Sequence, residues 1–117
     1  MEQLKKNIRD NIYIMKDVSQ KKLRDLNYHY DKNRSDNEFE FYSRKFPVYK
    51  HYFRPEIECV ISIDVNTGIA SINVYTVSTG NIYAPFYQNE YGNYEKVMSI
   101  IHGNIISEIN RIGLTEV

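Results

Sequence analysis

Residues 57–74 read IECVISIDVNTGIASINV, two alternating runs of apolar and polar residues on either side of a short turn. The apolar positions of the first run are Ile57, Cys59, Ile61 and Ile63, and those of the second are Ala70, Ile72 and Val74. Alternation with a period of two is typical of a β-strand with one buried face. A four-residue loop, 65–68, pairs position 63 with 70, 61 with 72 and 59 with 74, so that all apolar side chains share one face. The stretch therefore predicts an antiparallel hairpin, with Asp64 bonding the amides of the turn and Gly68 in the left-handed conformation.

The residues around this hairpin extend the predicted sheet. Residues 38–54 are rich in aromatic side chains, and Pro47 among them indicates an interrupted strand or an edge strand. Ile82 to Phe86 follow a second Thr-Gly turn and are expected to return as the next strand. We predict an antiparallel meander of three to five strands within residues 38–87.

Both ends of the chain show helical spacing. Apolar residues recur every three or four positions within 1–30, with a slip at Ser19 that could cap a second helix, so this segment predicts one bent helix or a helix pair. The same spacing over 94–112, ended by Gly113, predicts a C-terminal helix. The order of elements predicts a single α+β domain over 1–117, with the helices packed on one face of the sheet.

The net charge of the chain is +0, from 15 Lys+Arg and 15 Asp+Glu, but the charges are unevenly distributed. Residues 1–54 contain 13 basic and 8 acidic residues (13 − 8 = +5), and residues 55–117 contain 2 and 7 (2 − 7 = −5). Such a dipolar chain can present a basic surface and could also associate head to tail into a homo-oligomer. No apolar run suits a membrane span or a secretory signal, so we expect a protein of the cytoplasm that does not bind membranes.

The motifs of common enzymes and cofactor sites are absent from the sequence, including GxGxxG, GxxxxGK[ST], HExxH, CxxC and GxSxG. Cys59 is the one cysteine, and its inward position predicts a buried thiol rather than a nucleophile. We therefore expect no cofactor, no metal and no catalytic residue. An enzyme would have to assemble its site from scattered residues such as Tyr49, His51, Arg54, Glu58 and His102.

The segment 42–54, YSRKFPVYKHYFR, combines five aromatic rings with four Lys or Arg residues and contains no acid. Protein-binding hot spots use Tyr and Arg in this way, and nucleic-acid sites combine cations with stacking rings. A third interpretation is an edge strand whose rings pack in the core. The residues of the candidate partner-binding site are Tyr42, Arg44, Lys45, Tyr49, Lys50, Tyr52 and Arg54.

The function that these features favour is a small non-catalytic binding protein, which acts on a protein partner as an inhibitor or accessory factor. The alternative is a nucleic-acid-binding module that uses residues 5–24 together with residues 42–54. Ile, Asn, Tyr and Lys supply 15, 12, 11 and 9 residues, and all four have A/T-rich codons. This usage indicates a low-GC bacterium or one of its phages as the source.

Overall fold

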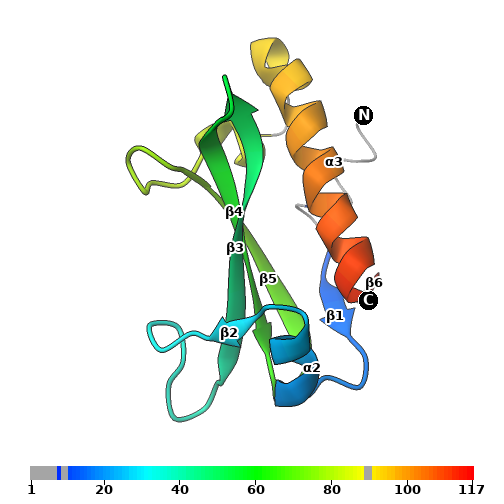
Figure 1. Cartoon of the computed structure of the whole chain (residues 1–117). Helices are drawn as coiled ribbons and strands as arrows, with labels where there is room; N and C mark the ends of the chain where they lie inside the picture. The colour runs from blue at the N-terminus through cyan, green and yellow to red at the C-terminus, as the bar shows by residue number, and fades with distance from the viewer. Residues whose placement is uncertain (1–7, 9–10, 89–90) are drawn as a thin grey trace.

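The computed structural model describes residue 8, residues 11–88 and residues 91–117. Within these ranges the chain forms a six-stranded antiparallel sheet and one long helix, α3 (Glu95–Ile112), which packs against the sheet (Figure 1). The strands are β1 (Tyr13–Met15), β2 (His29–Tyr30), β3 (Phe41–His51), β4 (Arg54–Asp64), β5 (Ile69–Thr76) and β6 (Leu114–Glu116). The spatial order is β2-β3-β4-β5-β1-β6. The predicted α+β class, antiparallel sheet and C-terminal helix are confirmed.

The central hairpin has the register that its alternation predicts. β4 pairs with β5 through Ile63 and Ala70, Ile61 and Ile72, and Cys59 and Val74. In the turn, the Asp64 carboxylate accepts hydrogen bonds from the Asn66 amide at 3.0 Å and the Thr67 hydroxyl at 3.0 Å. Gly68 has φ +80°, as predicted. This hairpin is therefore determined locally, by side-chain alternation and turn chemistry.

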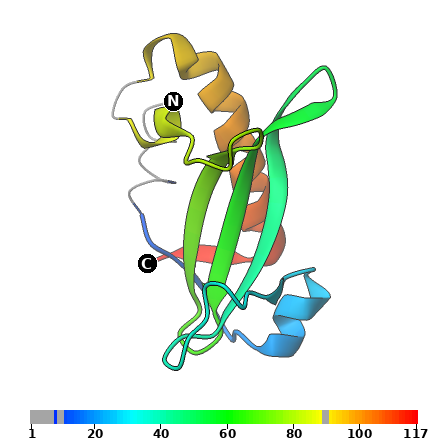
Figure 2. The ribbon, with the colours of Figure 1, turned by 90° about the vertical axis from the view of Figure 1, so that its left-hand side faces the viewer.

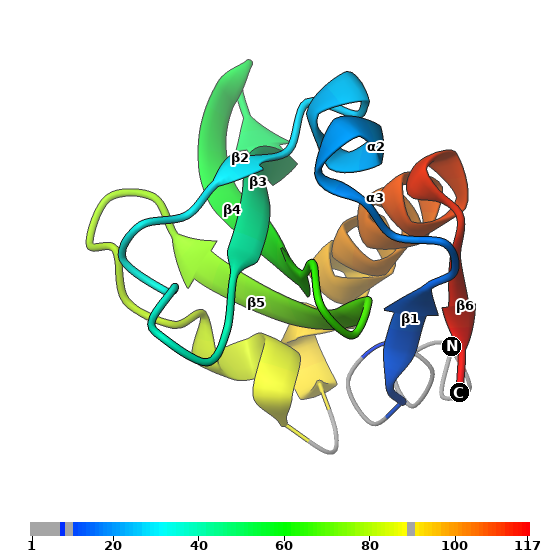
Figure 3. The ribbon, with the colours of Figure 1, turned by 90° about the horizontal axis from the view of Figure 1, so that it is seen from below.

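The core lies between the inner face of the sheet and α3. The sheet curves, so that α3 lies in its concave side, between β3 and the β1–β6 pair (Figure 3). The buried apolar residues of α3 are Met98, Ile101, Ile105, Ile109 and Ile112. They follow the three- and four-residue spacing of one helix face. The helix ends at Gly113, whose amide bonds the carbonyl of Ile109 at 3.0 Å with φ +77°.

The predicted bent helix or helix pair over 1–30 is not confirmed as a whole: the described part is helical at Ile8 and over Gln20–Asp25 but contains a strand between them. Tyr13–Met15 is strand β1, which lies between β5 and β6, and the helix α2 is confined to Gln20–Asp25. Helical spacing would bury Ile12, but Ile12 is 58% exposed, whereas Tyr13 and Met15 are buried at alternate positions. Pairing with β5 and β6 thus overrides the helical pattern. Ser19 does cap α2, since its hydroxyl accepts from the Lys22 amide at 3.1 Å. Residues 1–7, 9 and 10 of the predicted helix lie outside the described residues.

The extent of the sheet also differs from the prediction of three to five strands in 38–87. Only β3, β4 and β5 of the described strands fall in that range, and β1, β2 and β6 come from outside it. Ile82 makes a single bridge with Tyr75 instead of a strand, and Ala84–Tyr87 forms a 3-10 helix (η1). Pro85 explains the change, because proline lacks the amide that a continuing strand would donate. A second 3-10 helix, η2 (Gly92–Tyr94), precedes α3.

The β3–β4 hairpin positions the site. Each strand has 11 residues, which at roughly 3.3 Å per residue spans about 36 Å. β2 covers the outer edge of β3 only at Tyr42 and Ser43. The far end of the hairpin projects from the body of the protein (Figure 2).

Candidate protein-binding surface

The tip of the β3–β4 hairpin consists of two adjacent aromatic residues. His51 pairs with Arg54 across the tip, so Tyr52 and Phe53 form a two-residue turn. Their φ angles are +48° and +68°, which is the left-handed pattern of a type I′ hairpin turn. Tyr52 is 84% exposed and Phe53 is 96% exposed. Two large rings therefore stand in solvent in a backbone conformation that residues other than glycine seldom adopt.

The same tip carries two cations, Lys50 and Arg54. Lys50, His51 and Arg54 are all exposed, and none of them makes an ion pair with any residue in the described part of the chain. The His51 ring contacts the Tyr52 ring edge to face, with centroids 4.4 Å apart. We call residues 50–54 the hairpin tip. It joins flat apolar surface to unpaired positive charge.

Two other residues of the predicted site, Tyr42 and Arg44, belong to the fold. Tyr42 is buried and contacts the ring of Tyr30 edge to face at 6.0 Å. The Arg44 guanidinium lies over the ring of Phe46 at 5.1 Å and pairs with Glu108 at 3.0 Å. Their aromatic and basic character therefore serves packing and internal charge pairing.

Lys45 and Tyr49 occupy intermediate positions along β3. Lys45 lies opposite Val60 and reaches Glu58 at 3.7 Å. Tyr49 lies opposite Ile57 and is half-buried against the core. Of the seven predicted site residues, the structure thus brings Lys50, Tyr52 and Arg54 together at the tip and distributes the other four along the strand.

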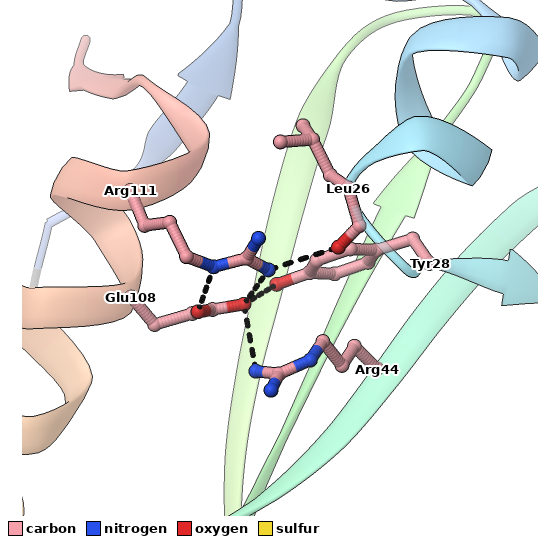
Figure 4. A network of polar contacts seen from close by, with 5 residues as sticks. All are labelled: Leu26, Tyr28, Arg44, Glu108 and Arg111. Atoms are coloured by element: carbon pink, nitrogen blue, oxygen red, sulfur yellow. Dashed lines mark hydrogen bonds and ion pairs between the residues drawn. The ribbon is translucent and has the colours of Figure 1, made fainter.

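The Glu108 carboxylate explains why Arg44 faces inward (Figure 4). It accepts a hydrogen bond from the Tyr28 hydroxyl at 2.8 Å and two from the Arg111 guanidinium, at 2.7 and 2.9 Å. Arg111 also donates to the Leu26 carbonyl at 2.9 Å. One buried carboxylate therefore ties α3 to β3 and to the segment that links α2 with β2.

The pKa values in this network follow from burial and pairing. Burial alone would raise the pKa of the Glu108 carboxyl, but the hydrogen bonds from Arg111 and Tyr28 and the charge of Arg44 outweigh it, so the pKa lies below its usual range. Burial raises the pKa of Tyr28, and the neighbouring Glu108 charge raises it further. Glu108 is thus held as an anion and Tyr28 as a neutral donor.

A groove runs beside the hairpin tip, between the distal half of β3 and α3. Its volume is 460 Å³, and its lining residues are Pro47, Val48, Tyr49, Lys50, Ile100 and Asn104. The pairing of β3 with β4 shifts at Val48, which is the extra residue of a β-bulge. The Asn104 side chain donates to the Val48 carbonyl at 2.7 Å. Ile100 is 48% exposed at the rim of the groove.

Further tyrosines lie near this end of the sheet. Burial raises the pKa of Tyr83, and the nearby Tyr94, Glu56 and Tyr49 raise it further. Tyr94 is 46% exposed. The site predicted from the sequence does not include Phe53, which lies in the tip itself, or Ile100, which only the packing of α3 against β3 brings to the groove beside the tip.

The basic residues of the predicted nucleic-acid surface are spread along the described part of the chain. Lys16, Lys21, Lys22 and Arg24 lie in and around α2, at the β2 end of β3, whereas the hairpin tip is at the other end (Figure 1). Lys21 is paired with Asp25 at 3.0 Å. Lys5, Lys6 and Arg9 lie outside the described residues.

The structure also places the residues considered for other chemistry. Cys59 is fully buried, and burial raises the pKa of its thiol. His102 is buried against Phe86 and Tyr91 in the core, while His51 is at the tip. Among residues 8, 11–88 and 91–117, no three His, Cys, Asp or Glu side chains come together in a way that could hold a metal ion. None of the helices described is both long and apolar enough to cross a membrane.

Comparison with known proteins identifies a similar fold. The crystal structure of a DUF1831 family protein from Lactobacillus plantarum superposes with a TM-score of 0.51 over 90% of this chain and 86% of that chain, at 13% sequence identity. At this identity the similarity concerns the fold alone. No family model matches the sequence, and no significantly similar curated protein is found.

Proposed function

We propose that this chain is a small non-catalytic binding protein that contacts a protein partner through its hairpin tip. The observation that carries the proposal is the exposure of Tyr52 and Phe53, at 84% and 96%, on a two-residue turn in the left-handed conformation. The left-handed conformation costs a residue other than glycine about 1–2 kcal/mol. Local strain and solvated rings of this kind concentrate at sites of recognition.

The physical properties of the tip suit a protein surface. Tyr and Phe bury large areas with little loss of side-chain entropy, and burial of apolar area contributes roughly 25 cal/mol per Å². Lys50 and Arg54 beside the rings would steer and orient an acidic partner. The hairpin is fixed to the body by a sheet and a buried ion-pair network, so the rings are preorganised for contact.

The role that fits such a domain is steric. A partner that receives the projecting rings would have the rest of this domain placed over the neighbouring surface, as in an inhibitor or an accessory factor. We infer that role for a protein of a low-GC bacterium or its phage, in line with the residue usage.

The proposal is tested by capture of partners from a host lysate on the immobilised protein. The double variant Tyr52→Ala, Phe53→Ala should weaken capture at least tenfold, which corresponds to about 1.4 kcal/mol. Phe39→Ala is the matched control, because Phe39 is 44% exposed at the opposite end of β3. Circular dichroism should show the same thermal transition for the tip variant and the wild type, since neither ring is buried.

Two results would contradict the proposal. The first is equal capture by the tip variant and the control. The second is capture of nuclease-sensitive material whose affinity falls steeply with salt, which would assign the tip to nucleic acid instead.

A further inference from the structure

The groove between β3 and α3 adds a second contact surface to the hairpin tip. Its lining residues include the cation Lys50 and no acid. The carboxylate of α3 nearest along the helix, Glu108, is buried and already paired with Arg44 and Arg111. The groove is therefore apolar at the exposed Pro47 and Ile100, and its lining carries one cation.

The backbone of β3 is not suited to pairing with a strand of the partner. The Phe41 carbonyl accepts from the Asp31 amide, so alternation directs the backbone groups of Phe41, Lys45 and Pro47 toward the outer edge of the sheet. Pro47 has no amide to donate, and the Val48 carbonyl is bonded to Asn104. Proline, a bulge and lysine are the usual means by which an edge strand resists pairing. A strand added to this edge would find no continuous ladder.

From these features we infer that the groove binds an acidic segment of the protein partner through side chains, with one apolar side chain packed against Pro47 and Ile100. Carboxylates that flank the apolar side chain meet Lys50. The inference rests on the proposed function, because the groove opens next to the hairpin tip and extends the same surface. It specifies the chemistry of the partner, which the tip alone leaves open.

The test uses a displayed library of random twelve-residue peptides, selected on the wild-type protein. The enriched peptides should carry an excess of Asp and Glu around one aliphatic or aromatic residue. Binding of one such synthetic peptide should shift the backbone amide resonances of residues 48–50 and 100–104. Peptides without acidic enrichment, no enriched peptide, or shifts confined to other parts of the chain would overturn the inference.

Two substitutions at one position separate apolar contact from charge. Ile100→Glu and Ile100→Lys both remove the apolar rim, and because Ile100 is about half exposed, both variants should fold. Ile100→Glu should weaken binding of the acidic peptide at least tenfold, and Ile100→Lys should weaken it clearly less. Equal weakening by the two variants would contradict the charge argument. Unchanged binding would show that the peptide does not bind in the groove.

The partner captured from the host lysate distinguishes failure of this inference from failure of the proposed function. If the Tyr52→Ala, Phe53→Ala variant no longer captures the partner but Ile100→Glu still does, the inference about the groove is overturned. The hairpin tip then remains as the binding site. A partner that the tip variant retains overturns the proposed function.

Discussion

Replacement of Gly68 tests how the first described strand is attached to the sheet. Gly68 ends the β4–β5 turn with φ +80°, and its carbonyl accepts a hydrogen bond from the Met15 amide at 2.9 Å. A Cβ atom placed on Gly68 would lie 2.4 Å from the Met15 carbonyl oxygen and 3.3 Å from Ile14 Cγ1. The first of these contacts is with backbone, which cannot rotate away, so β1 would have to shift.

The expected loss of stability for Gly68→Ala has two parts. The left-handed backbone costs an alanine about 1–2 kcal/mol. Displacement of β1 would weaken the Met15–Gly68 hydrogen bond, which contributes about 1 kcal/mol, and would disturb the packing of Met15, which is 1% exposed. We therefore expect a total loss of about 2–4 kcal/mol.

Gly80→Ala is the matched control. Gly80 has φ +74°, but a Cβ there would meet nothing within 4 Å, so this variant should lose only the backbone part, about 1–2 kcal/mol. Urea unfolding followed by circular dichroism measures both losses. Equal losses for the two variants would refute the reasoning, because they would show that β1 does not pack on Gly68.

Three further predictions concern the core. Tyr28→Phe keeps the buried ring but removes the hydroxyl that donates to Glu108, so it should cost about 1–2 kcal/mol in urea unfolding, and an unchanged midpoint would argue against this bond. Because the pKa of Glu108 is lowered in the folded protein, its contribution to stability is present above the unfolded pKa and is lost as the pH falls through the folded value. The difference in unfolding free energy between wild type and Glu108→Gln should therefore be largest near pH 7 and should shrink below about pH 4.3, and a difference independent of pH would contradict the network. Cys59 should react with a thiol reagent such as dithionitrobenzoate only after unfolding, since its thiol is buried, and rapid reaction of the native protein would place it at the surface.

The parts of the fold that the sequence predicts are those with local causes. The β4–β5 register follows from alternation and from the chemistry of Asp64 and Gly68, and the end of α3 follows from Gly113. Tyr13–Met15 could not be predicted as a strand, because three residues show no period, and the partners β5 and β6 lie far away in the sequence.

The candidate site was only partly predictable for a similar reason. The aromatic and basic composition of residues 42–54 indicates a surface, but the division of that segment depends on where β3 ends. A Tyr-Phe pair lacks the Asn-Gly signature of a two-residue turn, so nothing local predicts that Phe53 is exposed while Tyr42 is buried. The role of Arg44 depends on Glu108, 64 positions later in the chain, and becomes visible only in three dimensions.

The most direct test of the proposed binding surface is photo-crosslinking from the hairpin tip. A benzoylphenylalanine introduced in place of Phe53, and separately in place of Phe39, would be irradiated in the host cell, and the adducts would be identified by mass spectrometry. A specific protein adduct from position 53 and none from position 39 is the result that the proposal predicts. The same adducts from both positions, or a specific adduct from position 39 alone, would show that the hairpin tip is not the surface that contacts the partner.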